Sequence, residues 1–198
     1  MTNITTLLPG EHFMFKNFEW VCLDPNHPEG GVLAIMAKPW AKDVKFCPSA
    51  KFADEKGNWN NYRTSNVREI LHGIANVVFE RKGLLAHTVD LVADNGDRAY
   101  GTAQDFVFIL TCDEYRKYRD YIPLYDRWIW TATPWWCGDK DSDMVYSNYV
   151  CFVYPGGQLD YIDADYSGAI APACILNPKS LNLRQNMAYV EEVALRKE

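Results

Sequence analysis

The sequence predicts an α+β fold with small antiparallel sheets, two helices and long irregular loops. Short apolar runs recur along the chain and are bounded by Gly, Pro, Asn and Asp, which is the pattern of strands and turns. Two stretches in the middle of the chain carry helix-start signals. The chain has 198 residues and no internal repeat, which suffices for one sizeable core. We therefore expect a single domain over residues 1–198.

The first elements are predicted to be a hairpin and a third strand. Residues 11–15 and 18–23 are apolar runs on either side of residues 16–17, which have the place of a tight turn. Residues 24–31 hold two prolines and two glycines and are expected to form a loop. Residues 32–37 are apolar again and predict a strand.

Residues 38–63 show little hydrophobic periodicity and many polar side chains. We expect an irregular loop here that is held to the core by single aromatic side chains. These are Trp40, Phe46, Phe52, Trp59 and Tyr62.

The clearest helix signal covers residues 67–79. Asn66 can cap its first turn, and Glu69 follows three residues later. One apolar stripe is expected to face the core, and it consists of Val67, Ile70, Leu71, Ile74, Val77 and Val78. After residues 83–92 and a turn at 94–97, the sequence predicts a strand at 106–110. The spacing of Thr111 and Glu114 then indicates a capping box and a short helix through about Tyr118.

The last third alternates apolar strands with polar, aromatic connections. Trp128 and Trp130 are two residues apart, so both indoles are expected on one face of a strand. Residues 149–154 and 158–162 predict a hairpin around Pro-Gly-Gly. Residues 170–176 predict a last core strand. The C-terminal extension, residues 180–198, has the spacing of an amphipathic helix.

Composition excludes some classes of function. Twenty basic and 26 acidic side chains give a net charge of −6, which argues against nucleic acid as a partner. Aromatic residues make up 14% of the chain, with twelve Tyr and seven Trp, more than a core needs. Some of them are therefore expected at a half-exposed contact surface.

The N-terminus has no signal-peptide pattern, and no stretch approaches the ~20 apolar residues of a membrane span. We expect a cytoplasmic or virion-associated protein without membrane insertion. The six cysteines lack Cys-x-x-Cys spacing and are predicted to be reduced. Cys22, Cys151 and Cys174 lie in apolar runs and are predicted to be small buried side chains.

Five blocks of the chain, taken in order, resemble a known family. They are the opening at residues 13–24, a helix after a lone tryptophan at 59–71, a strand and helix at 105–118, the tryptophan-rich block 128–134, and the block 169–173. Together they resemble the uncharacterised bacterial and phage domains with a C-type-lectin-like fold, distantly related to formylglycine-generating-enzyme-type domains. Two arginines of that pattern are replaced, by Ala132 and Ala171, which predicts an apolar arrangement in their place.

The resemblance implies that strands from the two ends of the chain pair, that two helices flank a small antiparallel sheet, and that long loops lie on one side. It implies a non-catalytic role in holding a ligand. Proteins of this fold also serve as variable proteins of diversity-generating retroelements, including phage receptor-binding tips.

The loops 135–148 and 160–167 have the Tyr, Trp and Asp content expected of such a surface. We expect them to bind a protein or glycan partner, with no cofactor and no metal ion. The predicted ligand-binding residues are Trp135, Trp136, Asp139, Asp141, Asp143, Tyr146, Asn148, Asp160, Tyr161, Asp163 and Tyr166.

Three alternatives stay open at this point. Residues 139–143 begin like an EF-hand, but Met144 and Val150 replace the required glycine and glutamate, which favours a solvated acidic loop. An enzyme could use Cys137, expected to be exposed, or an acidic pair such as Asp139 and Asp163. An assembly subunit of a phage or bacterial complex would use the exposed aromatics as contacts between subunits, so an oligomer is possible.

Overall fold

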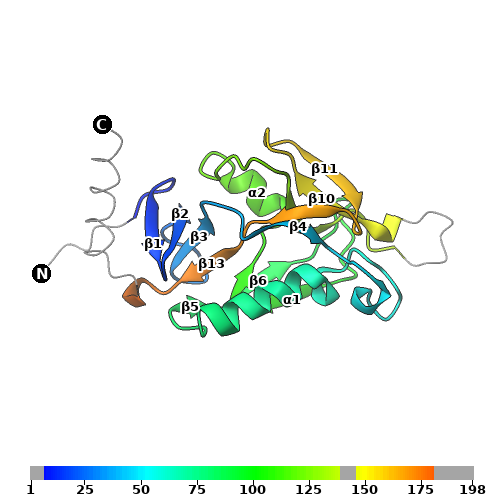
Figure 1. Cartoon of the computed structure of the whole chain (residues 1–198), viewed down its shortest axis with the longest axis horizontal. Coiled ribbons are helices and arrows are strands. Elements are labelled where there is room, and N and C mark those ends of the chain that lie inside the picture. Colours follow the sequence, from blue (N-terminus) through cyan, green and yellow to red (C-terminus); the bar gives the residue numbers. More distant parts are fainter. Residues whose placement is uncertain (1–6, 139–145, 181–198) are drawn as a thin grey trace, which may run out of the picture.

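The structure is a computed structural model that describes residues 7–138 and 146–180, and it confirms the α+β class (Figure 1). One sheet has the strand order β1-β2-β3-β13-β5, and β8 also pairs with β13. A second sheet has the order β11-β10-β9-β12-β4, and β6 pairs with β7. The strands are β1 (His12–Phe15), β2 (Phe18–Asp24), β3 (Val32–Met36), β4 (Ala41–Lys45), β5 (Leu84–Leu85), β6 (His87–Asp90), β7 (Thr102–Asp105), β8 (Val107–Phe108), β9 (Ile129–Pro134), β10 (Tyr149–Val153), β11 (Leu159–Asp163), β12 (Ser167–Ile170) and β13 (Ala173–Leu176). The helices are α1 (Asn66–Gly73) and α2 (Cys112–Tyr118), and the helical turns are η1 (Ala50–Phe52), η2 (Tyr62–Thr64), η3 (Ile74–Val78), η4 (Tyr146–Asn148) and η5 (Pro178–Ser180).

The predicted N-terminal hairpin is confirmed. Strands β1 and β2 are antiparallel and Phe15 pairs with Phe18. Lys16 and Asn17 form the turn with φ of 53° and 67°, and two such residues are what the tightest hairpin turn needs. Trp20 is fully buried, and its indole N–H donates to the Phe15 carbonyl at 3.2 Å.

A long antiparallel ribbon joins the two larger sheets. β13 pairs with β3 in the first sheet, and β12 pairs with β4 in the second. Between these pairs, the Met36 N–H donates to the Pro172 carbonyl and the Trp40 N–H to the Ile170 carbonyl, both at 2.9 Å. The ribbon therefore continues from one sheet into the other. Since β13 shares a sheet with β1, β2 and β3, strands from both ends of the described chain lie together, as expected.

The prediction of one continuous strand at 170–176 is wrong. The strand ends at Ile170 and a new one begins at Ala173, in the other sheet. Pro172 has no N–H for the ladder, so the chain can change sheets there. The sheets are also not purely antiparallel, because β12 runs parallel to β9 at Ala169 and Ile129.

The prediction for residues 38–63 is partly wrong, because strand β4 forms within them. β4 is an edge strand of the second sheet, and the Trp130 indole N–H donates to its Val44 carbonyl at 2.8 Å. The expected anchoring by aromatics is confirmed: Phe46 and Tyr62 are fully buried. Three further aromatics are half-buried against the core, namely Trp40, Phe52 and Trp59.

The predicted helix at 67–79 is present as α1 followed by the π-helical turn η3. Its N-cap is Ser65 rather than Asn66, because the Ser65 hydroxyl accepts from the Arg68 N–H at 3.1 Å. Val67, Leu71 and Ile74 are buried as predicted. Val77 is 79% exposed, so its assignment to the core stripe is wrong. A π-helical turn holds more residues than an α-helical one, which shifts the later positions around the helix axis.

The predicted capping box of the second helix is confirmed at α2. Thr111 Oγ1 accepts from the Glu114 N–H at 3.2 Å, and Glu114 Oε2 accepts from the Thr111 N–H at 2.8 Å. The strand before it is shorter than predicted and covers Val107–Phe108 only. No helix among residues 7–138 and 146–180 is long and apolar enough to cross a membrane.

The tryptophan-rich block, residues 128–134, belongs to the core of the fold. The Trp128 and Trp130 rings meet edge to face with centroids 4.7 Å apart, so they lie on the same side as predicted, although β9 begins only at Ile129. Trp130 is buried, and Trp128 packs half-buried against the core. Ala132 and Ala171, which replace the arginines, are both buried in the apolar core.

All six cysteines are free and buried, which includes the three predicted to be buried hydrophobes. The predicted amphipathic helix at 180–198 lies outside the described residues, apart from Ser180 in η5.

Candidate ligand-binding surface

Five aromatic side chains form a continuous set of ring contacts, which we call the aromatic cluster. Trp135 stacks on Tyr161 with ring centroids 4.0 Å apart and an interplanar angle of 25°. Tyr161 contacts Tyr149 at 5.6 Å, and Tyr149 contacts Tyr146 at 6.2 Å. Tyr146 in turn contacts Trp136 at 5.5 Å. The cluster thus joins three chain segments: the end of β9, the η4–β10 segment and β11. In Figure 1 the η4 turn, drawn in yellow, lies at the opposite end of the molecule from β1 and β2.

Strand register brings these rings together. In the β10–β11 hairpin, Cys151 pairs with Tyr161 and Tyr149 pairs with Asp163. Tyr149 and Tyr161 are therefore diagonal neighbours on one face of the sheet, within reach of aromatic side chains. The Trp135 N–H donates to the Tyr149 carbonyl at 2.9 Å and extends the β9–β10 pairing beyond Pro134.

The cluster is held by its own contacts and still presents surface. Tyr161 is 41% exposed, and the four other members are half-buried. Tyr and Trp supply large contact areas with few rotatable bonds, so that little conformational entropy is lost on binding. Rings that are already stacked in the free protein lose even less conformational entropy on binding.

Asn60 fixes the two chain segments that carry Trp136 and Tyr149. It is fully buried, and its side-chain Nδ2 donates to the Trp136 carbonyl at 2.8 Å and to the Tyr149 carbonyl at 3.0 Å. Nδ2 also lies 3.4 Å from the Tyr146 carbonyl. Its Oδ1 accepts from the Tyr100 hydroxyl at 2.7 Å. One amide therefore ties both sides of the segment between Trp136 and Tyr146.

The backbone beside Asn60 adds to this attachment. The N–H groups of Trp59 and Asn60 both donate to the Ser147 carbonyl, at 3.1 and 3.0 Å. Ser147 lies in η4, between two members of the aromatic cluster. The base of the candidate surface is thus hydrogen-bonded to a buried segment far away in sequence.

That segment is itself fixed by Asp54. Its carboxylate accepts from the Lys56 and Asn58 N–H groups at 3.0 and 2.9 Å, and from the side-chain amides of Asn58 and Asn61, both at 3.0 Å. Burial raises the pKa of Asp54, but these hydrogen bonds outweigh burial and hold the pKa below its ordinary value.

The shift predicts an acid-dependent contribution of Asp54 to stability. Because the folded-state pKa is lowered, the contribution is complete above the ordinary aspartate pKa and is lost as the pH falls through the folded-state value. The difference in unfolding free energy between the wild type and Asp54→Asn should therefore be constant from about pH 7 to 5 and shrink below about pH 4. Denaturant unfolding at several pH values measures it. A difference that does not change with pH would contradict this role of Asp54.

Four of the predicted site residues meet in the cluster: Trp135, Trp136, Tyr146 and Tyr161. The sequence prediction missed Tyr149, although the register of the predicted hairpin would have placed it beside Tyr161. It also missed Asn60, because a single asparagine in a predicted loop carries no sequence signal of a structural role.

The predicted second loop, 160–167, is partly a strand, since Asp160, Tyr161 and Asp163 lie in β11. The pairing with β10 confirms the predicted hairpin strand at 158–162, which includes Asp160 and Tyr161, and the loop prediction is wrong there and at Asp163. Asp160 is exposed, and its Oδ1 accepts from the Tyr161 N–H at 2.8 Å. Asp163 is half-buried, and burial, together with the nearby Asp165, raises its pKa.

The remaining predicted residues are peripheral or lie outside the described part of the chain. Asn148 is half-buried beside Tyr149. Tyr166 is 56% exposed in the turn after β11. Asp139, Asp141 and Asp143, with the EF-hand-like start, fall outside the described residues.

Cys137 is not exposed, contrary to the prediction. It is 5% exposed and its Sγ lies 3.9 Å from the Asp97 carbonyl. Burial raises the pKa of the Cys137 thiol to about 11, so at neutral pH it is a thiol rather than a thiolate nucleophile. Cys137 borders a hollow of about 360 Å³, and no histidine is among the described residues that line it. These findings weigh against Cys137 as a nucleophile.

Comparisons of the chain with protein-family models, with curated proteins and with solved structures gave no match.

Proposed function

We propose that this chain is a non-enzymatic binding module whose aromatic cluster holds a protein or glycan ligand. The observation that carries the proposal is the set of five contacting rings at one end of the molecule, on a base fixed by Asn60. A fixed array of partly exposed Trp and Tyr rings suits recognition, because these residues dominate the binding energy of many interfaces.

The surroundings of the cluster support both ligand types. Ring faces accept apolar side chains or the C–H faces of sugars. The exposed Asp160 is adjacent to Tyr161 and can accept hydrogen bonds from amides or hydroxyls. In the sequence, the predicted ligand-binding residues Asp139, Asp141 and Asp143 lie between the cluster members Trp136 and Tyr146.

The scaffold in this proposal is C-type-lectin-like. The sharing of one sheet by β13 and the N-terminal strands supports it, as does the presence of two helices beside small sheets. A narrower version is that the chain is a variable protein of a diversity-generating retroelement, or a phage receptor-binding protein. This version predicts a near-identical template repeat and a reverse-transcriptase gene beside the coding sequence. A gene neighbourhood without both would contradict the retroelement version alone.

The binding proposal is tested by screening the full chain on a glycan array and against a displayed peptide library. The triple variant Trp136→Ala, Tyr146→Ala, Tyr161→Ala should weaken binding of each ligand found by more than about 100-fold, since it removes three anchor side chains. Tyr121→Ala is the matched control, because Tyr121 is 43% exposed outside the cluster. Unchanged binding by a folded triple variant would contradict the proposal. If the triple variant instead dissociated an oligomer in light scattering, the assembly-subunit alternative would replace it.

A further inference from the structure

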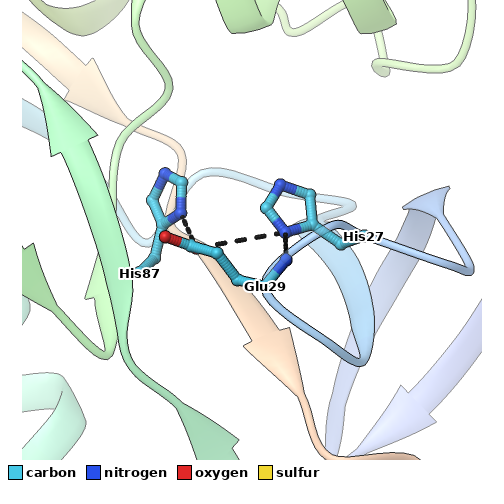
Figure 2. Close-up of side chains that lie close together, drawn as sticks. All are labelled: His27, Glu29 and His87. Atoms are coloured by element: carbon cyan, nitrogen blue, oxygen red, sulfur yellow. Dashed lines mark hydrogen bonds and ion pairs between the residues drawn. The ribbon is translucent and has the colours of Figure 1, made fainter.

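A second group of side chains lies apart from the aromatic cluster, where the loop between β2 and β3 approaches β6. His27 and Glu29 come from the loop, and His87 is the first residue of β6. The donor atoms of the three residues lie within 4.8 Å of one another. Figure 2 shows that both imidazoles face Glu29 through Nδ1: His87 Nδ1 meets the Glu29 carboxylate, and His27 Nδ1 accepts from the Glu29 N–H at 3.3 Å. His87 Nδ1 lies 2.5 Å and His27 Nδ1 4.0 Å from Glu29 Oε2.

The loop that carries two of these residues is closed on itself. The His27 N–H donates to the Gly31 carbonyl at 3.0 Å, and the Gly30 N–H donates to the His27 carbonyl at 2.8 Å. Gly31 has φ of +111°, and a Cβ there would lie 2.5 Å from the Leu176 carbonyl oxygen. Only glycine fits at this close approach to β13. The loop backbone therefore sets the positions of His27 and Glu29 in advance.

Outer partners orient His87 and Glu29. Glu114 Oε1 lies 2.8 Å from His87 Nε2, so the carboxylate accepts a hydrogen bond from Nε2–H. His87 Nδ1 donates to Glu29 Oε2, and a metal ion would replace the Nδ1 proton. Glu29 Oε1 accepts from the Thr88 N–H at 3.0 Å, which leaves Oε2 toward the two imidazoles. A carboxylate behind a histidine is the usual arrangement at metal centres, because it fixes the tautomer and the ring orientation.

The spacing fits a metal ion once the His27 ring turns, so that Nδ1 exchanges the Glu29 N–H for the ion. Ligand atoms at 2.0–2.1 Å from a tetrahedral zinc ion are about 3.3 Å apart. The two Oε2 to Nδ1 distances, 2.5 and 4.0 Å, lie on either side of that value. Two histidines and one glutamate are a frequent zinc ligand set, with a fourth position for water.

The group formed by His27, Glu29 and His87 has a shielded side and an open side. The ring of Phe108 packs on His87 with centroids 4.2 Å apart, and the His87 side chain is almost fully buried. Glu29 is 31% exposed at its side chain, so an ion can enter from that side.

We propose that His27, Glu29 and His87 bind one divalent transition-metal ion, with zinc the expected species and Glu114 the residue that positions His87. The site is independent of the aromatic cluster, and its side chains come from a different region of the fold. Bound zinc would connect the β2–β3 loop to β6, and through Glu114 to α2.

The test is calorimetric titration of the EDTA-treated, desalted full chain with Zn²⁺, paired with absorption spectra on Co²⁺ addition. We expect one ion per chain, visible Co²⁺ bands of a tetrahedral site, and a higher midpoint of thermal unfolding with Zn²⁺. His27→Ala should weaken Zn²⁺ binding by more than about 100-fold, and Glu114→Gln by about 10- to 100-fold. His12→Ala is the matched control, because His12 lies 2.9 Å from a carboxylate, that of Glu19, at an exposed site.

Absence of saturable one-to-one binding by the wild type would overturn the proposal. Equal affinity in His27→Ala, shown by circular dichroism to be folded, would also overturn it. Cys112→Ser tests a rival location, since Asp94, Cys112 and Cys151 form another close group of donor atoms. Binding lost in Cys112→Ser but kept in His27→Ala would place the ion there and refute the assignment.

Discussion

Replacement of Asn60 with alanine is expected to lower the free energy of unfolding by about 2–4 kcal/mol, because the Trp136 carbonyl and the Tyr100 hydroxyl lose their partner and the Tyr149 carbonyl keeps only the Trp135 N–H. Each buried polar group without a partner costs about 1–3 kcal/mol, and two such groups are left in Asn60→Ala. Chemical denaturation followed by circular dichroism measures the loss.

Tyr100→Phe is the matched control for Asn60→Ala. It removes only the bond to Asn60 Oδ1 and leaves both bonds from Nδ2 to the Trp136 and Tyr149 carbonyls. We expect a smaller loss of about 1 kcal/mol. A loss in Asn60→Ala no larger than that in Tyr100→Phe would show that Asn60 does not fix the base of the aromatic cluster.

Replacement of Asp105 with asparagine is expected to cost about 3–5 kcal/mol of stability. The Asp105 side chain is fully buried and accepts from Arg68 Nε at 3.0 Å, from Arg68 Nη2 at 2.9 Å and from His72 Nε2 at 2.6 Å. These bonds connect β7 to α1. Without the carboxylate, the mostly buried Arg68 charge is left without its partner. Denaturant unfolding of Asp105→Asn and of the wild type measures this loss of stability.

Two controls separate the effect of charge from the effect of packing at the Arg68–Asp105 ion pair. His72→Ala should cost less than about 1 kcal/mol, because the His72 side chain is 45% exposed. The double variant Arg68→Met, Asp105→Leu should lose less than Asp105→Asn alone, since no unpaired charge is left buried. If the double variant were the less stable of the two, the large cost would come from packing and not from the unpaired guanidinium.

Local chemistry made part of the fold predictable from the sequence. The β1–β2 and β10–β11 hairpins and the Thr111 capping box each depend on residues close together in the chain, and all three are present. β4 was missed because its charged, edge-strand sequence gives no apolar signal, and its partner β12 lies far along the chain. The split of the predicted strand 170–176 depends likewise on which sheet each half joins.

The candidate site was predictable in composition but not in arrangement. Tyr and Trp content identified four members of the cluster, whereas the contacts of Tyr149 follow from strand register. The role of Asn60 arises from hydrogen bonds to residues on distant segments, which no local pattern encodes. His27 and Glu29 are two residues apart, but only the fold brings His87 to them. Val77 was misplaced because the π-helical turn is not visible in the spacing of apolar residues.

The most direct test of the binding module is a pair of dissociation constants for one ligand obtained on the wild type. Tyr161→Ala removes an exposed ring that stacks on Trp135, and Tyr121→Ala removes an equally exposed ring outside the cluster. We expect the dissociation constant to rise by about tenfold or more for Tyr161→Ala and to stay within about twofold for Tyr121→Ala. Equal changes in the two variants would contradict binding through the aromatic cluster.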